Sequence, residues 1–200
     1  MESTAYQIEN RIKSGSRKKL YFNADFAAYG SPEAIKKTLQ RLAKSGLLMR
    51  VAHGIYYYPQ IEAKWGNTAI PPTIEEIAKG IAKRDKIRIV PTGIYALNAL
   101  GLSTQVPVNI VFITDGAARR ISIGKGKGIL FKHSSETRIF AYKSKILMLI
   151  VSALREIGEG NFTVTQLEII KKHLHEVTYN EFNTDIQLAP LWVRKTLLSL

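Results

Sequence analysis

Basic and amide side chains gather on one side of a helix predicted over residues 32–45. At about 100° per residue they span roughly 140° of the helix surface. They are Lys36, Lys37, Gln40, Arg41 and Lys44. Arg and Gln can form paired hydrogen bonds with guanine and adenine edges in the DNA major groove, and lysines reach phosphates. The pattern therefore predicts a DNA-reading helix; the alternative is a charged face that only contacts solvent.

The opposite side of the same helix is apolar. Ile35, Leu39 and Leu42 fall within an arc of roughly 60°, which predicts that this side is buried. Ser31-Pro32-Glu33 supplies an N-cap, a proline at the first helical position and an acid suited to the helix dipole. Gly46 is the expected residue just past the helix end. One face of the helix is thus anchored and the other is free for a partner. Ser31, at the start of the helix, is included among the expected DNA contacts.

The neighbouring stretches predict a winged helix-turn-helix. Residues 25–29 form a short helix that ends at the Gly30 turn, and the chain then enters a hairpin, the wing, joined through Ala52-His53-Gly54. Arg50 and His53 are expected at or near the tip of the wing, in reach of the DNA backbone or minor groove. A helix over residues 3–14 and a short strand that pairs with the wing precede these elements.

Some aromatic and basic side chains near this motif have two interpretations. Tyr56-Tyr57-Tyr58 can pack in the core or hydrogen-bond to phosphates. Arg17-Lys18-Lys19 is either a second phosphate contact or a solvated loop.

A further basic group surrounds the glycine-rich stretch Gly124-Lys125-Gly126-Lys127-Gly128, predicted as a hairpin loop. Its cations are Arg119, Arg120, Lys125 and Lys127. A phosphate-binding P-loop would open a helix, whereas the β-prone sequence ILFKH follows here. Two interpretations of this stretch are left: a flexible basic turn, or a contact with a nucleic-acid backbone.

The charge of the chain favours a polyanionic partner. The sequence has 29 Lys and Arg against 16 Asp and Glu, and 46% hydrophobic residues are ample for a folded core. Residues 1–60 hold 10 basic and 4 acidic groups, residues 61–142 hold 12 and 6, and residues 143–200 hold 7 and 6. We expect the surface that meets the polyanion to come from the first 142 residues.

The predicted fold class is α+β, with an N-terminal winged helix-turn-helix and a larger mixed α/β domain that ends in helices. The winged domain covers residues 1–59, a linker residues 60–72, and the second domain residues 73–200. Thr73 to Glu76 reads as a capping box that opens a helix. Strands and helices then alternate, and Thr165 to Glu168 reads as a second capping box in the helical last third.

Motifs of catalysis and metal binding are missing from the sequence. There is no cysteine and no H-E-x-x-H, G-x-S-x-G or G-x-G-x-x-G pattern. His173 and His175 would point to different sides of a helix, and Asp115 with Glu136 gives only a loose nuclease-like pair. We expect no enzyme, metal or cofactor. No signal peptide or membrane-spanning run is evident, so the expected compartment is the cytoplasm.

The stretch SPEAIKKTLQRLAKSGLLMRVAHGIYYYP, followed by TGIYALNALGLSTQVP and a strand, resembles the AbiEi-type antitoxins. This resemblance implies a bacterial type IV toxin–antitoxin operon, whose antitoxin represses its own promoter through the N-terminal domain. It implies double-stranded DNA with inverted repeats as a partner, bound by a homodimer, and a nucleotidyltransferase-like toxin that need not be in direct contact. No membrane is involved.

Two other classes stay open from the sequence. One is a winged-helix transcription regulator with no toxin partner. The other is an RNA-binding factor or a nucleic-acid enzyme whose chemistry lies in residues 73–200.

Overall fold

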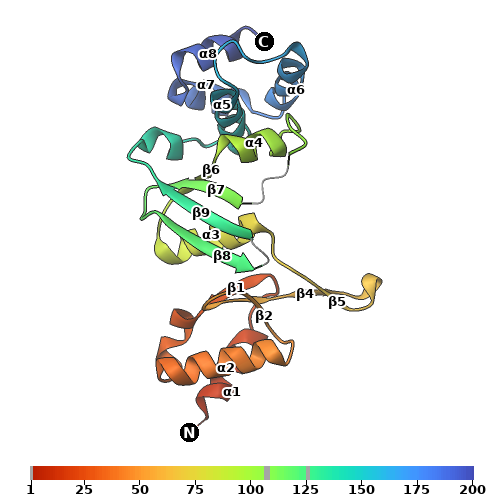
Figure 1. Cartoon of the computed structure of the whole chain (residues 1–200), viewed down its shortest axis with the longest axis vertical. Coiled ribbons are helices and arrows are strands. Elements are labelled where there is room, and N and C mark those ends of the chain that lie inside the picture. The colour runs from red at the N-terminus through yellow and green to blue at the C-terminus, as the bar shows by residue number, and fades with distance from the viewer. Residues whose placement is uncertain (1, 106–108, 125–126) are drawn as a thin grey trace. The chain divides into compact units, whose positions relative to one another are not determined.

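The structure is a computed structural model that describes residues 2–105, 109–124 and 127–200 (Figure 1). The chain divides into two compact units, Met1–Lys83 with Ile121–Gly126 and Arg84–Arg120 with Lys127–Leu200. The predicted α+β class is confirmed: an N-terminal winged helix-turn-helix precedes a larger mixed α/β part that ends in helices.

The first unit begins with the winged helix-turn-helix. Its elements are α1 (Thr4–Lys13), β1 (Lys19–Phe22), η1 (Asn23–Tyr29), α2 (Pro32–Lys44), β2 (Met49–Ala52) and β3 (Ile55–Tyr58). The short helix before the turn is a 3₁₀ helix, η1, not an α-helix. The sheet order is β1-β3-β2 with antiparallel neighbours, so the strand before η1 pairs with the wing as predicted.

A small core closes this motif on the apolar side of α2. Ile8 and Ile12 of α1 and Leu39 of α2 are fully buried, and Phe26 of η1 stacks on Tyr21 with ring centroids 5.7 Å apart. A Cβ atom on Gly30 would lie 2.7 Å from Thr4 Oγ1, so a glycine is needed where the turn passes α1. The helix-turn-helix is therefore fixed by packing against α1 as well as by its own turn.

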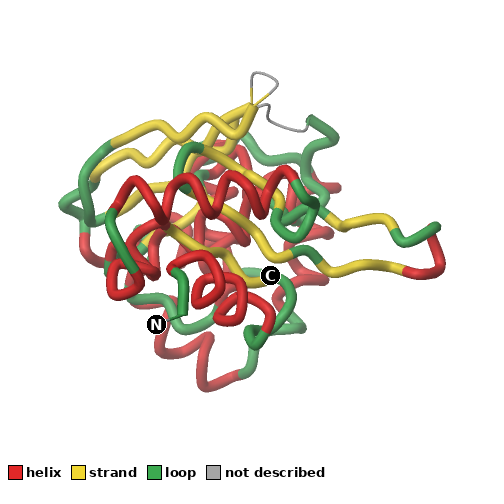
Figure 2. Tube along the Cα trace, turned by 90° about the horizontal axis from the view of Figure 1, so that it is seen from below, coloured by secondary structure: helices red, strands yellow, loops and turns green. Residues whose placement is uncertain are grey.

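Residues 60–72, expected as a linker, hold regular structure. They form β4 (Gln60–Glu62), the 3₁₀ turn η2 (Ala63–Trp65) and β5 (Thr68–Ile70), an antiparallel hairpin that projects from the rest of its unit in Figure 2. Gly66 and Asn67 both have positive φ, at 68° and 56°, which reverses the chain tightly. Glycine and asparagine here mark a hairpin turn, so their reading as linker punctuation is corrected.

The next helix, α3 (Ile74–Asp85), packs within the first unit. It begins with the predicted capping box, because Glu76 N donates to Thr73 Oγ1 at 3.1 Å and Thr73 N donates to Glu76 Oε2 at 2.7 Å. A Cβ on Gly80 would lie 2.4 Å from Leu20 Cδ1, so α3 lies close against β1. The compact unit accordingly runs beyond residue 72, to Lys83.

A four-stranded sheet has the order β6-β7-β9-β8, and its strands β6, β7 and β9 belong to the second unit. Its strands are β6 (Ile89–Pro91), β7 (Asn109–Thr114), β8 (Arg119–Gly124) and β9 (Lys127–His133). β6 is antiparallel to β7, and β7 is parallel to β9. The buried rings of Phe112 and Phe131 lie side by side on β7 and β9 with centroids 6.1 Å apart, which fixes the register of the central pair.

Helices make up the rest of this unit, with α5 at their centre (Figure 1). They are α4 (Gly93–Ala99), η3 (Thr137–Phe140), α5 (Lys145–Ile157), α6 (Val164–Leu174), α7 (Tyr179–Asp185), η4 (Ile186–Leu188) and α8 (Leu191–Leu198). Leu147, Ile150 and Leu154 of α5 are fully buried, as its apolar sequence predicts. The predicted capping box at Thr165 is wrong: Thr163 caps α6 and pairs with Gln166.

Candidate nucleic-acid interface

The local structure of α2 orients the predicted DNA-reading side chains. Ser31 Oγ accepts a hydrogen bond from Ala34 N at 3.3 Å, and Pro32 occupies the first turn, as the sequence predicts. Ile35, Leu39 and Leu42 are at most 4% exposed, so the apolar face is locked into the core. The rotation of the helix about its axis is thereby set.

The predicted basic face of α2 is open. Lys36, Lys37, Arg41 and Lys44 are exposed, and Gln40 is half-buried between them. Within the described residues, none of these five side chains forms an ion pair. Four cations held at fixed spacing without acidic partners are a strong local source of positive potential.

One acidic residue of α1 influences this face. Glu9 pairs with Lys13 at 2.7 Å, and its pKa is lowered first by that hydrogen bond and, to a smaller extent, by the charge of Arg41. Because Glu9 is already engaged by Lys13, the Arg41 guanidinium keeps its donors for another ligand.

The wing carries its two predicted contacts on a short hairpin. Arg50 and His53 are exposed, and Gly54 at the turn has φ of 68°. The pairing register of β2 with β3 shifts between Arg50 and Ala52, so the ladder is irregular next to the tip of the wing. With Ser31 and the α2 side chains, all eight predicted primary contacts are accessible, in one motif.

The three consecutive tyrosines of the wing are buried. Tyr56, Tyr57 and Tyr58 are 2%, 1% and 5% exposed, and burial raises the pKa of Tyr56 and Tyr57. In a strand with one face in water, alternate side chains would be exposed, whereas all four residues of β3 are buried. The three tyrosines therefore pack in the core, and the alternative, hydrogen bonding to phosphates, does not fit their burial.

The predicted secondary contact Arg17-Lys18-Lys19 divides into two kinds of residue. Arg17 Nη1 donates to Pro59 O at 2.9 Å, and its guanidinium lies 4.1 Å from the centre of the Tyr58 ring. Lys18 and Lys19 are exposed, Lys18 with a positive φ of 66°. Arg17 thus ties the start of β1 to the end of β3. Both lysines are accessible to phosphates, and Lys19 Nζ also lies 5.1 Å from the centre of the Tyr21 ring.

The basic group near β8 also divides. The Arg119 guanidinium pairs with Asp85 and lies 5.3 Å from the centre of the Phe131 ring. Hydrogen bonds from Arg84 and, to a smaller extent, from Arg119 lower the pKa of Asp85. Arg120 and Lys127 are exposed, and among the described residues the Arg120 side chain makes a long 3.4 Å contact with Asn109 Oδ1. Lys125 lies outside the described residues.

Asp115 and Glu136, the nuclease-like pair considered from the sequence, are each paired with an arginine. Asp115 Oδ2 accepts from Arg88 Nε at 2.7 Å, and this contact lowers the pKa of Asp115; Glu136 Oε2 contacts Arg155 Nη2 at 3.4 Å. Among the described residues, no three His, Asp or Glu side chains are grouped to hold a metal ion. A search of the same residues finds no helix with the length and apolarity to cross a membrane.

Comparison with known proteins gives one family. A model of DUF6088, a family of unknown function, matches residues 7–182. The chain belongs to DUF6088. The match takes in the winged motif and the sheet, so both parts are features of this family's region. No curated protein and no solved structure matches the chain.

Proposed function

We propose that this DUF6088 protein is a DNA-binding transcription regulator that acts as antitoxin and autorepressor of a bacterial type IV toxin–antitoxin operon. The observation that supports it most is the exposed cationic face of α2. The opposite face of this helix is buried, with Ile35, Leu39 and Leu42 at most 4% exposed. Such a helix in a helix-turn-helix enters the major groove, with the wing beside it on the backbone or in the minor groove.

The antitoxin part of the proposal is supported by the resemblance of residues 31–59 and 92–107 to AbiEi-type antitoxins. The operator is then the protein's own promoter, with inverted repeats bound by a homodimer in the cytoplasm. A nucleotidyltransferase-like toxin is the functional partner, with or without direct contact. A regulator without a toxin shares the same DNA contacts and differs only in the neighbouring gene.

Alanine variants on α2 test how this surface binds. Arg41→Ala or Gln40→Ala should lose about 1–3 kcal/mol on the cognate duplex and relax the preference at one base position, because each side chain can pair with a base edge. Lys44→Ala should weaken all duplexes alike, since a lysine–phosphate contact carries no sequence information. The measurement is a competition titration against singly substituted operators; three identical profiles would contradict base reading by α2.

Co-expression tests the antitoxin role. The full chain should restore growth of cells that express the neighbouring toxin gene, whereas residues 1–59 alone should not. If the full chain fails to protect while still repressing its promoter, a plain repressor is the correct description.

A further inference from the structure

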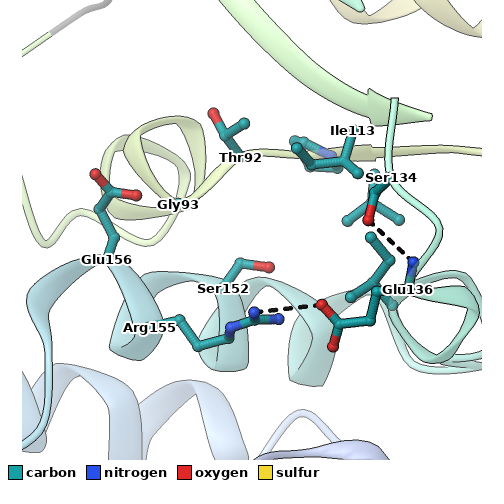
Figure 3. Close-up of a pocket in the computed structure, with 11 residues that line it drawn as sticks. Thr92, Gly93, Ile113, Ser134, Glu136, Ser152, Arg155 and Glu156 are labelled. Atoms are coloured by element: carbon teal, nitrogen blue, oxygen red, sulfur yellow. Dashed lines mark hydrogen bonds and ion pairs between the residues drawn. The ribbon is translucent and has the colours of Figure 1, made fainter. Parts of the chain in front are cut away.

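A pocket of about 400 Å³ lies in the second unit, between the sheet and α5 (Figure 3). Val90 of β6, Ile113 of β7 and Ile139 of η3 form its apolar wall. Its polar wall comes from α5 and from the loop before η3. This volume is in the range of small-molecule sites, which are mostly apolar with a few placed polar groups.

The polar wall is built by one side of α5. Ser152, Arg155 and Glu156 are three and four residues apart, so they share a face of the helix. The other side of α5 is held by the buried Leu147, Ile150 and Leu154. The helix cannot rotate, and its polar groups are therefore fixed relative to the apolar wall.

Close packing also fixes the end of the pocket where α4 starts. A Cβ on Gly93 would lie 2.4 Å from Glu156 Cβ and 2.7 Å from Ser152 O. A glycine is required for α4 to approach α5 this closely, and the contact leaves the Glu156 carboxylate beside Gly93 (Figure 3). The pocket is therefore formed in advance of any ligand.

The charges in the pocket are loosely paired. Arg155 Nη2 and Glu136 Oε2 are 3.4 Å apart, and their side chains are 45% and 47% exposed. Such a pair contributes little to stability. Most of the five guanidinium N–H donors remain open to a ligand, and in the described structure the Ser152 hydroxyl has no hydrogen-bond partner.

The charge balance of the lining selects the class of ligand. One arginine faces two carboxylates, Glu136 and Glu156, in a protein whose formal net charge is +13. A phosphate or a nucleotide would meet both carboxylates with a single cation to neutralise it. A molecule with adjacent positive and negative groups can satisfy both signs.

We propose that this pocket binds a free α-amino acid with an apolar side chain. Its carboxylate pairs with the planar fork of Arg155 and with the Ser152 hydroxyl. Its ammonium pairs with Glu136, so that the two ligand charges enter the stretched ion pair in place of the direct contact. The apolar side chain lies against Val90, Ile113 and Ile139.

The experiment is ligand-observed NMR and calorimetry on the full-length chain, with the proteinogenic amino acids in small pools and no DNA present. At least one apolar amino acid should bind. Its primary amide, which lacks the carboxylate, and its N-acetyl derivative, which lacks the ammonium, should bind about 10- to 100-fold more weakly. Failure of every amino acid to bind, or equal binding of either derivative, overturns the proposal.

Variants place the site. Arg155→Met and Glu136→Gln should each weaken binding about 10- to 100-fold, while Arg138→Met, an exposed cation of η3 outside the pocket lining, should not change it. Thermal unfolding curves establish that each variant is folded. Unchanged affinity in Arg155→Met, or stronger binding of inorganic phosphate than of any amino acid, contradicts the assignment. Because no DNA is present, the result is independent of the proposed promoter binding.

Discussion

At the scale of single residues, the arginines of this protein differ in whether their guanidinium groups are engaged within the chain. Arg17 and Arg119 have their guanidinium groups bound to a backbone carbonyl or a carboxylate and placed over aromatic rings. Arg41 and Arg50 are exposed and form no ion pair among the described residues. The sequence left the roles of Arg17 and Arg119 open, because a positive charge count does not register intramolecular partners.

Arg17→Ala should act on stability and leave DNA recognition nearly intact. Loss of the hydrogen bond to Pro59 O and of the contact with Tyr58 should lower the free energy of unfolding by about 1–2 kcal/mol. Lys18→Ala is the matched control, with an expected change within about 0.5 kcal/mol. Urea unfolding measures both. A normal urea midpoint for Arg17→Ala together with weakened DNA binding would assign Arg17 to the interface instead.

At the scale of elements, the caps decide where helices begin. The capping box of α6 consists of Thr163 and Gln166, with Gln166 N donating to Thr163 Oγ1 at 3.2 Å and Thr163 N to Gln166 Oε1 at 2.9 Å. Thr165-x-x-Glu168 has the same form but lies inside the helix. Two overlapping patterns in one sequence cannot be separated without knowing which threonine has extended backbone angles.

Thr163→Ala should destabilise the second unit by about 1 kcal/mol, because the backbone N–H of Gln166 loses its partner. Thr165→Ala, on an exposed position of the same helix, should be neutral or slightly stabilising, since alanine is the better helix former. Thermal unfolding of both variants gives the comparison. Equal losses from the two changes would show that the cap is not the origin of the effect.

Elements with a clear apolar period could be predicted and others could not. α2 has such a period, and it begins and ends within a residue of its predicted bounds. α7 was not predicted, because Tyr179 to Asp185 carries no apolar stripe and is held by the Thr178–Glu181 cap and by its neighbours. η1 takes a 3₁₀ form that depends on packing against α1 and α2, which a local pattern does not contain.

For the candidate interface, the sequence predicted accessibility well on α2 and the wing. It left open the position of Tyr57, because burial on both sides of β3 depends on residues far away in the chain. It also could not anticipate that Asp85 engages Arg119, 34 residues away. Long-range contacts of this kind determine which basic residues remain free.

At the scale of the whole molecule, the exposed cations predict salt-dependent binding. About six phosphate contacts give a slope of log K against log salt near −5. Each of Lys36→Ala and Lys44→Ala should reduce its magnitude by about 1. Fluorescence anisotropy between low and physiological salt measures it. A slope shallower than about −2 for the parent chain would mean that the basic surface serves another ligand.

The central claim, sequence-specific recognition of duplex DNA through α2, is tested most directly by one affinity ratio. The full chain is titrated with a duplex of its own promoter and with a scrambled duplex of equal length and composition, at physiological salt. We predict a promoter affinity higher by about a thousandfold or more, the usual margin of specific over non-specific binding. Equal affinities for the two duplexes would contradict the account.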